Sequence, residues 1–167
     1  MPTFANLTAK IIVLITVLTP MFAASADAGN VWSINSYGLA YHFERAEAKR
    51  INSDNEVNPG LGVRYDFYAS GRHRWYAEAG IYYDSGRRWA KTADITWQYQ
   101  LIGGLRGGVG AFFFYTPTYN RGNAFIAPLP VVSYDFGSAV LTMAYAPKYR
   151  EKNVINTLGA FLSWKLP

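Results

Sequence analysis

The sequence contains no cysteine, and this absence removes several kinds of chemistry. Without a thiol, the chain has no disulfide framework, no cysteine nucleophile and no thiolate metal site. Histidine is also scarce, because His42 and His73 are the only two in 167 residues. His73 is expected at the opposite end of the fold from His42, so we expect no metal site and no cofactor.

Long apolar runs are absent after about residue 30, so no membrane-spanning helix is expected in the body of the chain. Half of the residues are nevertheless apolar, mean hydropathy is −0.03, and aromatic residues make up 17%. An aromatic excess is typical of membrane β-barrels, which place rings at both membrane–water boundaries. It is also compatible with a soluble β-sandwich, so composition leaves both classes open.

The first 26 residues predict a secretory signal peptide. Lys10 precedes an apolar run at residues 11–18, and Ala24-Ser25-Ala26 has the small-x-small form of a cleavage site. An uncleaved membrane anchor is the alternative, but the apolar run is short for that purpose. We therefore expect one mature domain over residues 27–167.

The formal net charge is +5, and removal of the signal peptide takes away only Lys10. A basic chain suits either nucleic acid or anionic lipid. Because a secretory signal directs the chain away from nucleic acid, we expect no nucleic-acid partner and favour anionic lipid.

Alternation of apolar with small or polar residues runs through the mature chain. It is clearest where Ile95, Trp97, Tyr99 and Leu101 alternate with Asp94, Thr96, Gln98 and Gln100. Strands are predicted at about residues 37–43, 60–67, 75–82, 94–101, 105–115, 124–134, 139–146 and 155–166. With their flanking residues the strands are expected to be roughly 9–12 residues long, which is the length that a tilted strand needs to cross a bilayer, and the period of two places an apolar face outward.

The connections between these strands alternate in length. Long ones are expected at about 44–58, 84–92, 116–123 and 147–154, and short ones at 69–74, 102–104 and 135–138. Outer-membrane barrels have short periplasmic turns and longer external loops. We therefore predict an all-β fold, an eight-stranded antiparallel transmembrane β-barrel of the outer membrane.

The later long connections are basic. They carry Arg87, Arg88, Lys91, Arg121, Lys148, Arg150 and Lys152, against the acids Asp84 and Glu151. Arginine and lysine pair with phosphate oxygens, so this rim is suited to phosphorylated glycolipids. An ordinary solvated loop surface is the alternative.

Prolines and small residues suggest a lumen that admits a hydrocarbon chain. Pro128 and Pro130 lie inside a predicted strand and Pro147 ends the next one. Proline cannot donate to a β-ladder, so these positions indicate either a bulge or a lateral opening. Gly38, Gly60 and Gly62 face inward and leave space, and Phe112 and Phe114 are expected to line the same region.

Three polar residues are predicted at the external rim. His42 ends the first strand, and Asp84 and Ser85 begin a connection in which Gly86 permits a turn. A histidine near neutrality can act as a general base toward a hydroxyl. The alternative is that Asp84-Ser85-Gly86 is only a hairpin turn and that His42 has no function.

These residues resemble the outer-membrane lipid A palmitoyltransferases over most of the mature chain. The resemblance is carried by His42 with Asn55-Glu56 and Gly60-Leu61-Gly62, by Asp84-Ser85 followed by Trp89 and Trp97, and by Pro128-Leu129-Pro130 running through Ser133, Met143 and Tyr145 to Pro147. It implies an eight-stranded antiparallel barrel.

The resemblance also implies site residues. The catalytic candidates are His42, Asp84 and Ser85, and the acyl pocket and lateral gates would involve Gly38, Gly60, Gly62, Thr96, Pro130, Pro147 and more loosely Pro59. Thr96 stands where the family has a glycine at the pocket floor, so a shorter acyl chain is expected. The implied partners are a phospholipid donor and a lipid A or related glycolipid acceptor, used by a monomer embedded in the outer membrane.

The sequence therefore supports three functions. The first is an acyltransferase in which His42 takes the acceptor proton and Asp84 orients or stabilises the imidazolium. In this reaction Ser85 is either a nucleophile or an oxyanion donor. The second is a non-enzymatic lipid-binding or structural barrel. The third is a lipid A deacylase that uses water as the acceptor.

Overall fold

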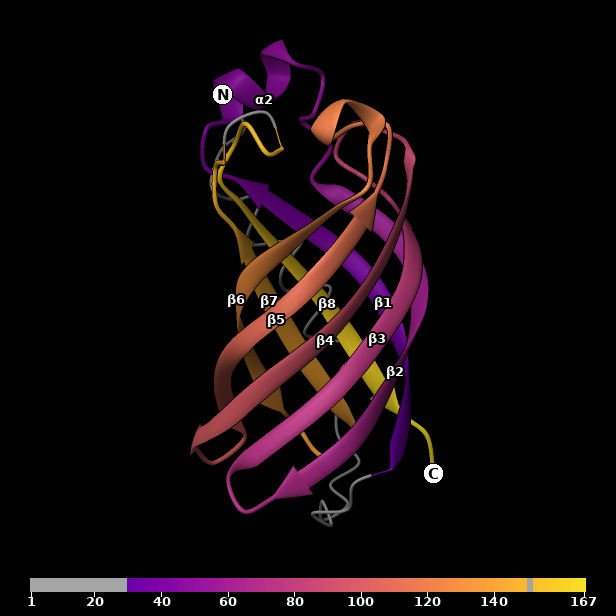
Figure 1. Ribbon diagram of the computed structural model, residues 1–167, viewed down its shortest axis with the longest axis vertical. Coiled ribbons are helices and arrows are strands. Elements are labelled where there is room, and N and C mark those ends of the chain that lie inside the picture. The colour runs from indigo at the N-terminus through magenta and orange to yellow at the C-terminus, as the bar shows by residue number, and fades with distance from the viewer. Residues whose placement is uncertain (1–29, 150–151) are drawn as a thin grey trace, which may run out of the picture.

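The computed structural model describes residues 30–149 and 152–167, which form a closed antiparallel β-barrel (Figure 1). Its strands are β1 (Val31–His42), β2 (Val57–Ser70), β3 (His73–Tyr83), β4 (Trp89–Ile102), β5 (Leu105–Tyr115), β6 (Phe125–Asp135), β7 (Ala139–Ala146) and β8 (Thr157–Lys165). The prediction of eight antiparallel strands is confirmed. The predicted signal peptide lies outside the described residues.

The barrel closes because the first strand pairs with the last. Along this seam Ser33 of β1 is opposite Lys165 of β8, and His42 is opposite Thr157. Every other strand pairs with its sequence neighbours, which closes the sheet into a barrel. Between the strands lie two short helices, α2 (Arg45–Arg50) and the 3₁₀ helix η1 (Asn120–Gly122). Within the described residues, no helix is long and apolar enough to cross a membrane.

The two ends of the barrel differ, as the alternation of connections predicts. Tight turns at 71–72, 103–104 and 136–138 form one end, the tight-turn end, at the bottom of Figure 1. Each contains a glycine with positive φ, namely Gly71 (55°), Gly103 (54°) and Gly137 (96°). The other end, the long-loop end, carries connections 43–56, 84–88, 116–124 and 147–156. The connection expected at 84–92 is shorter than predicted, because Trp89 already pairs with Tyr83.

The outer surface has the layering of a barrel that stands in lipid. Aliphatic side chains are exposed between the two strand ends, among them Val63, Ile95 and Val109. Exposed aromatic side chains gather toward the two ends, with Trp32, Tyr68, Trp75, Tyr134 and Phe136 near the tight turns and Tyr41, Phe43, Trp89, Tyr115 and Tyr149 near the long loops. Two aromatic girdles around an apolar band are the mark of a transmembrane barrel.

One strand departs from the predicted alternation. The sequence places Tyr37 on the outer face, but the pairing of β1 with β2 and β8 shifts between Tyr37 and Leu39. This β-bulge at Gly38 reverses which residues face inward. The Tyr37 ring therefore lies in the lumen, and a Cβ on Gly80 would come within 2.6 Å of it, while one on Gly62 would come within 3.0 Å of the Tyr37 hydroxyl. The space expected beside Gly62 is filled by this ring.

The lumen toward the tight-turn end is closed by a buried ionic network. Arg64 pairs with Asp66 at 2.8 Å and lies 3.6 Å from Glu78, and its guanidinium stacks on Tyr76 at 3.5 Å. A second group joins Asp135 to Lys165 at 2.8 Å and to Arg74 at 3.2 Å. Buried charges persist when each is paired, so this half of the lumen is filled by polar side chains rather than by a channel.

Candidate functional site

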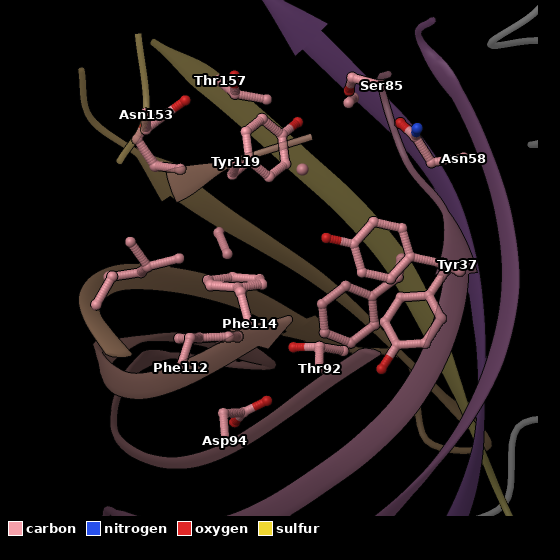
Figure 2. A pocket seen from close by; sticks show the side chains of 18 of the residues that line it. Tyr37, Asn58, Ser85, Thr92, Asp94, Phe112, Phe114, Tyr119, Asn153 and Thr157 are labelled. Carbon is pink, nitrogen blue, oxygen red and sulfur yellow. Dashed lines mark hydrogen bonds between the residues drawn. The ribbon is translucent and has the colours of Figure 1, made fainter. Parts of the chain in front are cut away.

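The half of the lumen toward the long loops contains a cavity of about 540 Å³. Its walls are mainly apolar, and Phe112 and Phe114 stack within it at 5.9 Å between ring centroids. Thr92 and Asp94 lie at its floor, and Ser85 and Tyr119 lie toward its mouth (Figure 2). Glu78, opposite Asp94 in the strand pairing, also lines the cavity. The prediction that Phe112 and Phe114 line the lumen is confirmed. A cavity of this size and lining suits a hydrocarbon chain.

The cavity borders the seam between β6 and β7. These strands pair only from Val131 opposite Ala144 to Asp135 opposite Val140, and the upper part of β6 pairs with β5 alone. Pro128 and Pro130 both lie in that upper part. Because proline has no backbone N–H, neither residue can donate a ladder hydrogen bond to β7. Ile126 is 64% exposed on the outer face and still lines the cavity. At this seam the cavity therefore reaches residues that are exposed on the outer surface.

The structure brings two of the three predicted catalytic residues together. His42 ends β1 and Ser85 follows β3, and His42 Nε2 lies 3.0 Å from Ser85 Oγ. Both side chains are buried, at 1% and 3% exposure, and Ser85 lines the cavity. An imidazole nitrogen in hydrogen-bonding contact with a serine hydroxyl is the arrangement that activates a nucleophile.

Asp84 does not join this pair. Its Oδ1 accepts the backbone N–H groups of Gly86 and Arg88, both at 2.9 Å, and its Oδ2 accepts the hydroxyl of Thr116. The carboxylate thus shapes the turn that carries Ser85 and ties it to the 116–124 loop. The geometry does not give Asp84 the expected role of orienting His42.

A different carboxylate faces the imidazole. Glu56 Oε1 lies 4.0 Å from His42 Nδ1, and Glu56 Oε2 accepts a hydrogen bond from Arg45 at 3.1 Å. The preceding residue, Asn55, donates its backbone N–H to the Ser85 carbonyl oxygen at 3.1 Å and its side-chain amide to that of Asp84 at 3.1 Å. The Asn55-Glu56 segment is therefore fastened to the Ser85 turn.

Tyr119 is a further residue at the mouth. It lies in the 116–124 loop, and it lines the cavity together with Ser85. Burial raises the pKa of Tyr119 to about 12, and the Ser85 side chain partly opposes that rise. The phenol is therefore a hydrogen-bond donor at neutral pH. Sequence alone carried no signal for Tyr119, whereas Glu56 was visible within the Asn55-Glu56 match but without a role.

The remaining predicted pocket residues divide into two groups. Gly38 and Pro147 line the cavity, and Pro130 lies in the part of β6 that has no β7 partner. Gly60, Gly62 and Thr96 are not among the lining residues. Thr96 donates to Asp94 Oδ1 at 2.8 Å and so lies beneath the floor rather than forming it. Asp94, and not Thr96, therefore contacts the cavity.

The basic rim is only partly described. Arg150 and Glu151 lie outside the described residues. Arg87 pairs with Asp54 at 2.9 Å, and Lys152 lies over the Tyr149 ring, where both residues line the cavity. The binding of lipid phosphates by this rim stays a prediction. Over residues 30–149 and 152–167, no three His, Asp or Glu side chains gather in a way that would hold a metal ion.

Comparisons with known proteins support the fold and leave the activity open. No family model matches the sequence, and no curated protein matches it. Among solved structures, the chain is similar to one from the de novo design of transmembrane β-barrels, with a TM-score of 0.57 and 13% identity, over 85% of this chain and 100% of that chain. This likeness agrees with a membrane-embedded barrel.

Proposed function

We propose that this membrane barrel is an acyltransferase of the bacterial outer membrane, which moves an acyl chain from a phospholipid to lipid A or a related glycolipid. The observation that carries the proposal is the contact of His42 Nε2 with Ser85 Oγ, 3.0 Å apart at the mouth of an apolar cavity. The cavity opens laterally through the β6–β7 seam, so an acyl chain has a route in from the bilayer.

In the first step, the donor acyl chain lies in the cavity with its ester carbonyl at Ser85. His42 takes the Ser85 proton at Nε2 as Oγ forms a bond to the carbonyl carbon. The Tyr119 phenol is placed to donate to the developing oxyanion. The C–O bond to the donor glycerol then breaks, and the lysophospholipid oxygen receives the proton from His42.

In the second step, a hydroxyl group of the glycolipid acceptor attacks the acyl-serine ester. His42 takes the acceptor proton, the new ester bond forms, and the bond to Ser85 Oγ breaks. The Ser85 oxygen then recovers the proton from His42, so each cycle exchanges one ester for another with no cofactor and no net redox change.

The placement in the outer membrane is also a proposal. It is supported by the contrast between tight turns at one end and long loops at the other, and by the two aromatic girdles. The small-x-small sequence Ala24-Ser25-Ala26 after an apolar run supports export.

A lipid A deacylase is the second candidate, because the same Ser85–His42 pair serves hydrolysis when water replaces the acceptor hydroxyl. The two reactions change the lipid in opposite directions. Transfer adds one acyl chain to the acceptor, whereas deacylation removes one.

Mass spectrometry of lipid A from cells that express the protein tests the proposal. We expect a species heavier by one acyl chain with the wild type, and its loss in Ser85→Ala and His42→Ala. Ser70→Ala and His73→Ala are the matched controls, because both residues are exposed at the tight-turn end. Loss of an acyl chain would establish the deacylase, and unchanged lipid in every strain would leave a non-enzymatic barrel.

A further inference from the structure

We infer that Glu56, held by Arg45, is the residue that positions His42 for proton transfer with Ser85. The inference rests on the proposed function only in that His42 acts on Ser85. It assigns the acidic position of a Ser–His–acid arrangement to the loop before β2 rather than to Asp84, the neighbour of the nucleophile in sequence.

The first evidence is a pair of buried atoms that lack hydrogen bonds. His42 Nδ1 and Glu56 Oε1 are both enclosed and without a hydrogen-bond partner, and they face each other at 4.0 Å. A buried polar atom without a partner costs free energy. A shift of about 1 Å, which would bring the two atoms within hydrogen-bonding distance, is therefore favourable for both. His42 Nε2 is already engaged by Ser85 Oγ, so the two ring nitrogens face a hydroxyl and a carboxylate.

The second evidence is how Glu56 is anchored. The Ala40 N–H of β1, two residues before His42, donates to the Glu56 carbonyl oxygen at 3.0 Å. On the other side, the Asn55 N–H binds the Ser85 carbonyl oxygen. The Glu56 backbone is therefore fixed to both strand ends that present the pair, and the side chain needs only a rotamer adjustment to reach Nδ1.

The third evidence is the use of the second carboxylate oxygen. Arg45 of α2 binds Glu56 Oε2 at 3.1 Å, and the Arg45 guanidinium also lies over the Tyr41 ring at 4.8 Å. This ion pair occupies Oε2 and leaves Oε1 for the imidazole. Asp84 has no such free oxygen, because Gly86, Arg88 and Thr116 already bind it.

The arrangement has a defined chemical consequence. With Nδ1–H directed at Glu56, the neutral imidazole presents an unprotonated Nε2 to the Ser85 hydroxyl. After proton transfer, the carboxylate stabilises the imidazolium. The charged groups that face His42 are Glu56 and Asp54 from the loop before β2 and Arg45 from α2.

The experiment uses the full-length barrel in detergent micelles and a fluorophosphonate reagent, which reports on the nucleophile without any lipid substrate. Ser85 Oγ bonds to phosphorus, fluoride leaves, and the serine proton passes to His42. We expect Glu56→Gln to lower the plateau labelling rate by about 10²-fold and to move the acidic limb of the pH–rate profile to lower pH, since the imidazolium loses its carboxylate. Glu56→Asp should restore part of the rate.

Two further variants make the test discriminating. Asp84→Asn keeps an acceptor oxygen for the two backbone N–H groups, so we expect labelling within about threefold of the wild type if Asp84 only shapes the turn. Glu47→Gln is the matched control, because Glu47 forms an exposed pair with Arg50 on α2. A large loss in Asp84→Asn with little change in Glu56→Gln would overturn the inference and return the acidic role to Asp84.

A spectroscopic measurement distinguishes a direct effect of Glu56 on the His42 ring from a general effect of Glu56 on the fold. The chain has two histidines, so ¹⁵N-histidine spectra of the wild type and of His73→Gln identify the His42 signals. We expect the Nδ1–H tautomer in the wild type and a tautomer mixture in Glu56→Ala. An unchanged His42 spectrum in Glu56→Ala would refute the inference. If labelling depends on Glu56 but the protein leaves lipid A unchanged, the proposed function is refuted and the inference about Glu56 stands.

Discussion

Thr116 donates its hydroxyl proton to Asp84, which joins the loop after β5 to the turn after β3. Both side chains are fully buried. We expect Thr116→Val to destabilise the barrel by about 1–3 kcal/mol, because one Asp84 oxygen loses its only partner. Denaturant unfolding in micelles measures this effect. Thr118→Val, next to the same turn but without a bond to Asp84, is the control and should unfold at a denaturant concentration close to that of the wild type.

Tyr119 supplies a second prediction. If its phenol donates to the oxyanion, Tyr119→Phe should lower the turnover rate by about 10²-fold with little change in the KM for the acyl donor. Because burial raises the Tyr119 pKa to about 12, the phenol stays neutral below that pH and the wild-type rate should not fall between about pH 7 and pH 9. Turnover in mixed micelles measures both, and equal rates in the two proteins would exclude the phenol from catalysis.

The β6–β7 seam can be tested with a covalent bridge, since the chain has no native cysteine. Continuing the pairing upward from Val131 opposite Ala144 brings Leu129 opposite Ala146. A Leu129→Cys/Ala146→Cys disulfide should abolish acyl transfer, and reduction should restore it, because the bridge closes the lateral opening. Val132→Cys/Met143→Cys lies in the already paired part of the seam and serves as the control. Full activity of the oxidised upper pair would show that lipid enters elsewhere.

Chain-length selection should depend on residues that touch the cavity. Gly38 lines it, and a Cβ there would meet only the Ala160 carbonyl oxygen at 3.9 Å, so a larger side chain fits and occupies acyl space. We expect Gly38→Val to shift the transferred chain toward fewer carbons. Thr96→Ala should not change it, because Thr96 lies beneath Asp94. The mass of the product distinguishes these outcomes, and a longer chain in Thr96→Ala would restore Thr96 as the floor.

The ionic network below the cavity should contribute strongly to stability. Arg64→Met leaves Asp66 and Glu78 buried without their shared cation, so we expect a loss of about 3–5 kcal/mol in the free energy of unfolding. Arg50→Met removes an exposed pair with Glu47 and should have no measurable effect. Similar unfolding midpoints for both variants would mean that water reaches the Arg64 network.

Much of the barrel follows from local patterns. The alternation in residues 94–101 predicts the outer and inner faces of β4, because side chains of a strand point to opposite sides in turn. Glycine-containing short turns and longer polar connections likewise predict which strand ends lie together. From this order alone, His42 and Ser85 are expected on the same rim.

The sequence by itself therefore determined the number of strands, their direction and the end of the barrel that carries His42 and Ser85. Only the tertiary structure decided the rest, namely that Tyr37 points inward, that Thr96 lies below the floor, and that Glu56 rather than Asp84 faces His42. A single-residue bulge at Gly38 reverses the faces without leaving a mark in the apolar pattern. Loop side chains, in turn, meet through contacts between segments far apart in sequence, which no local periodicity encodes.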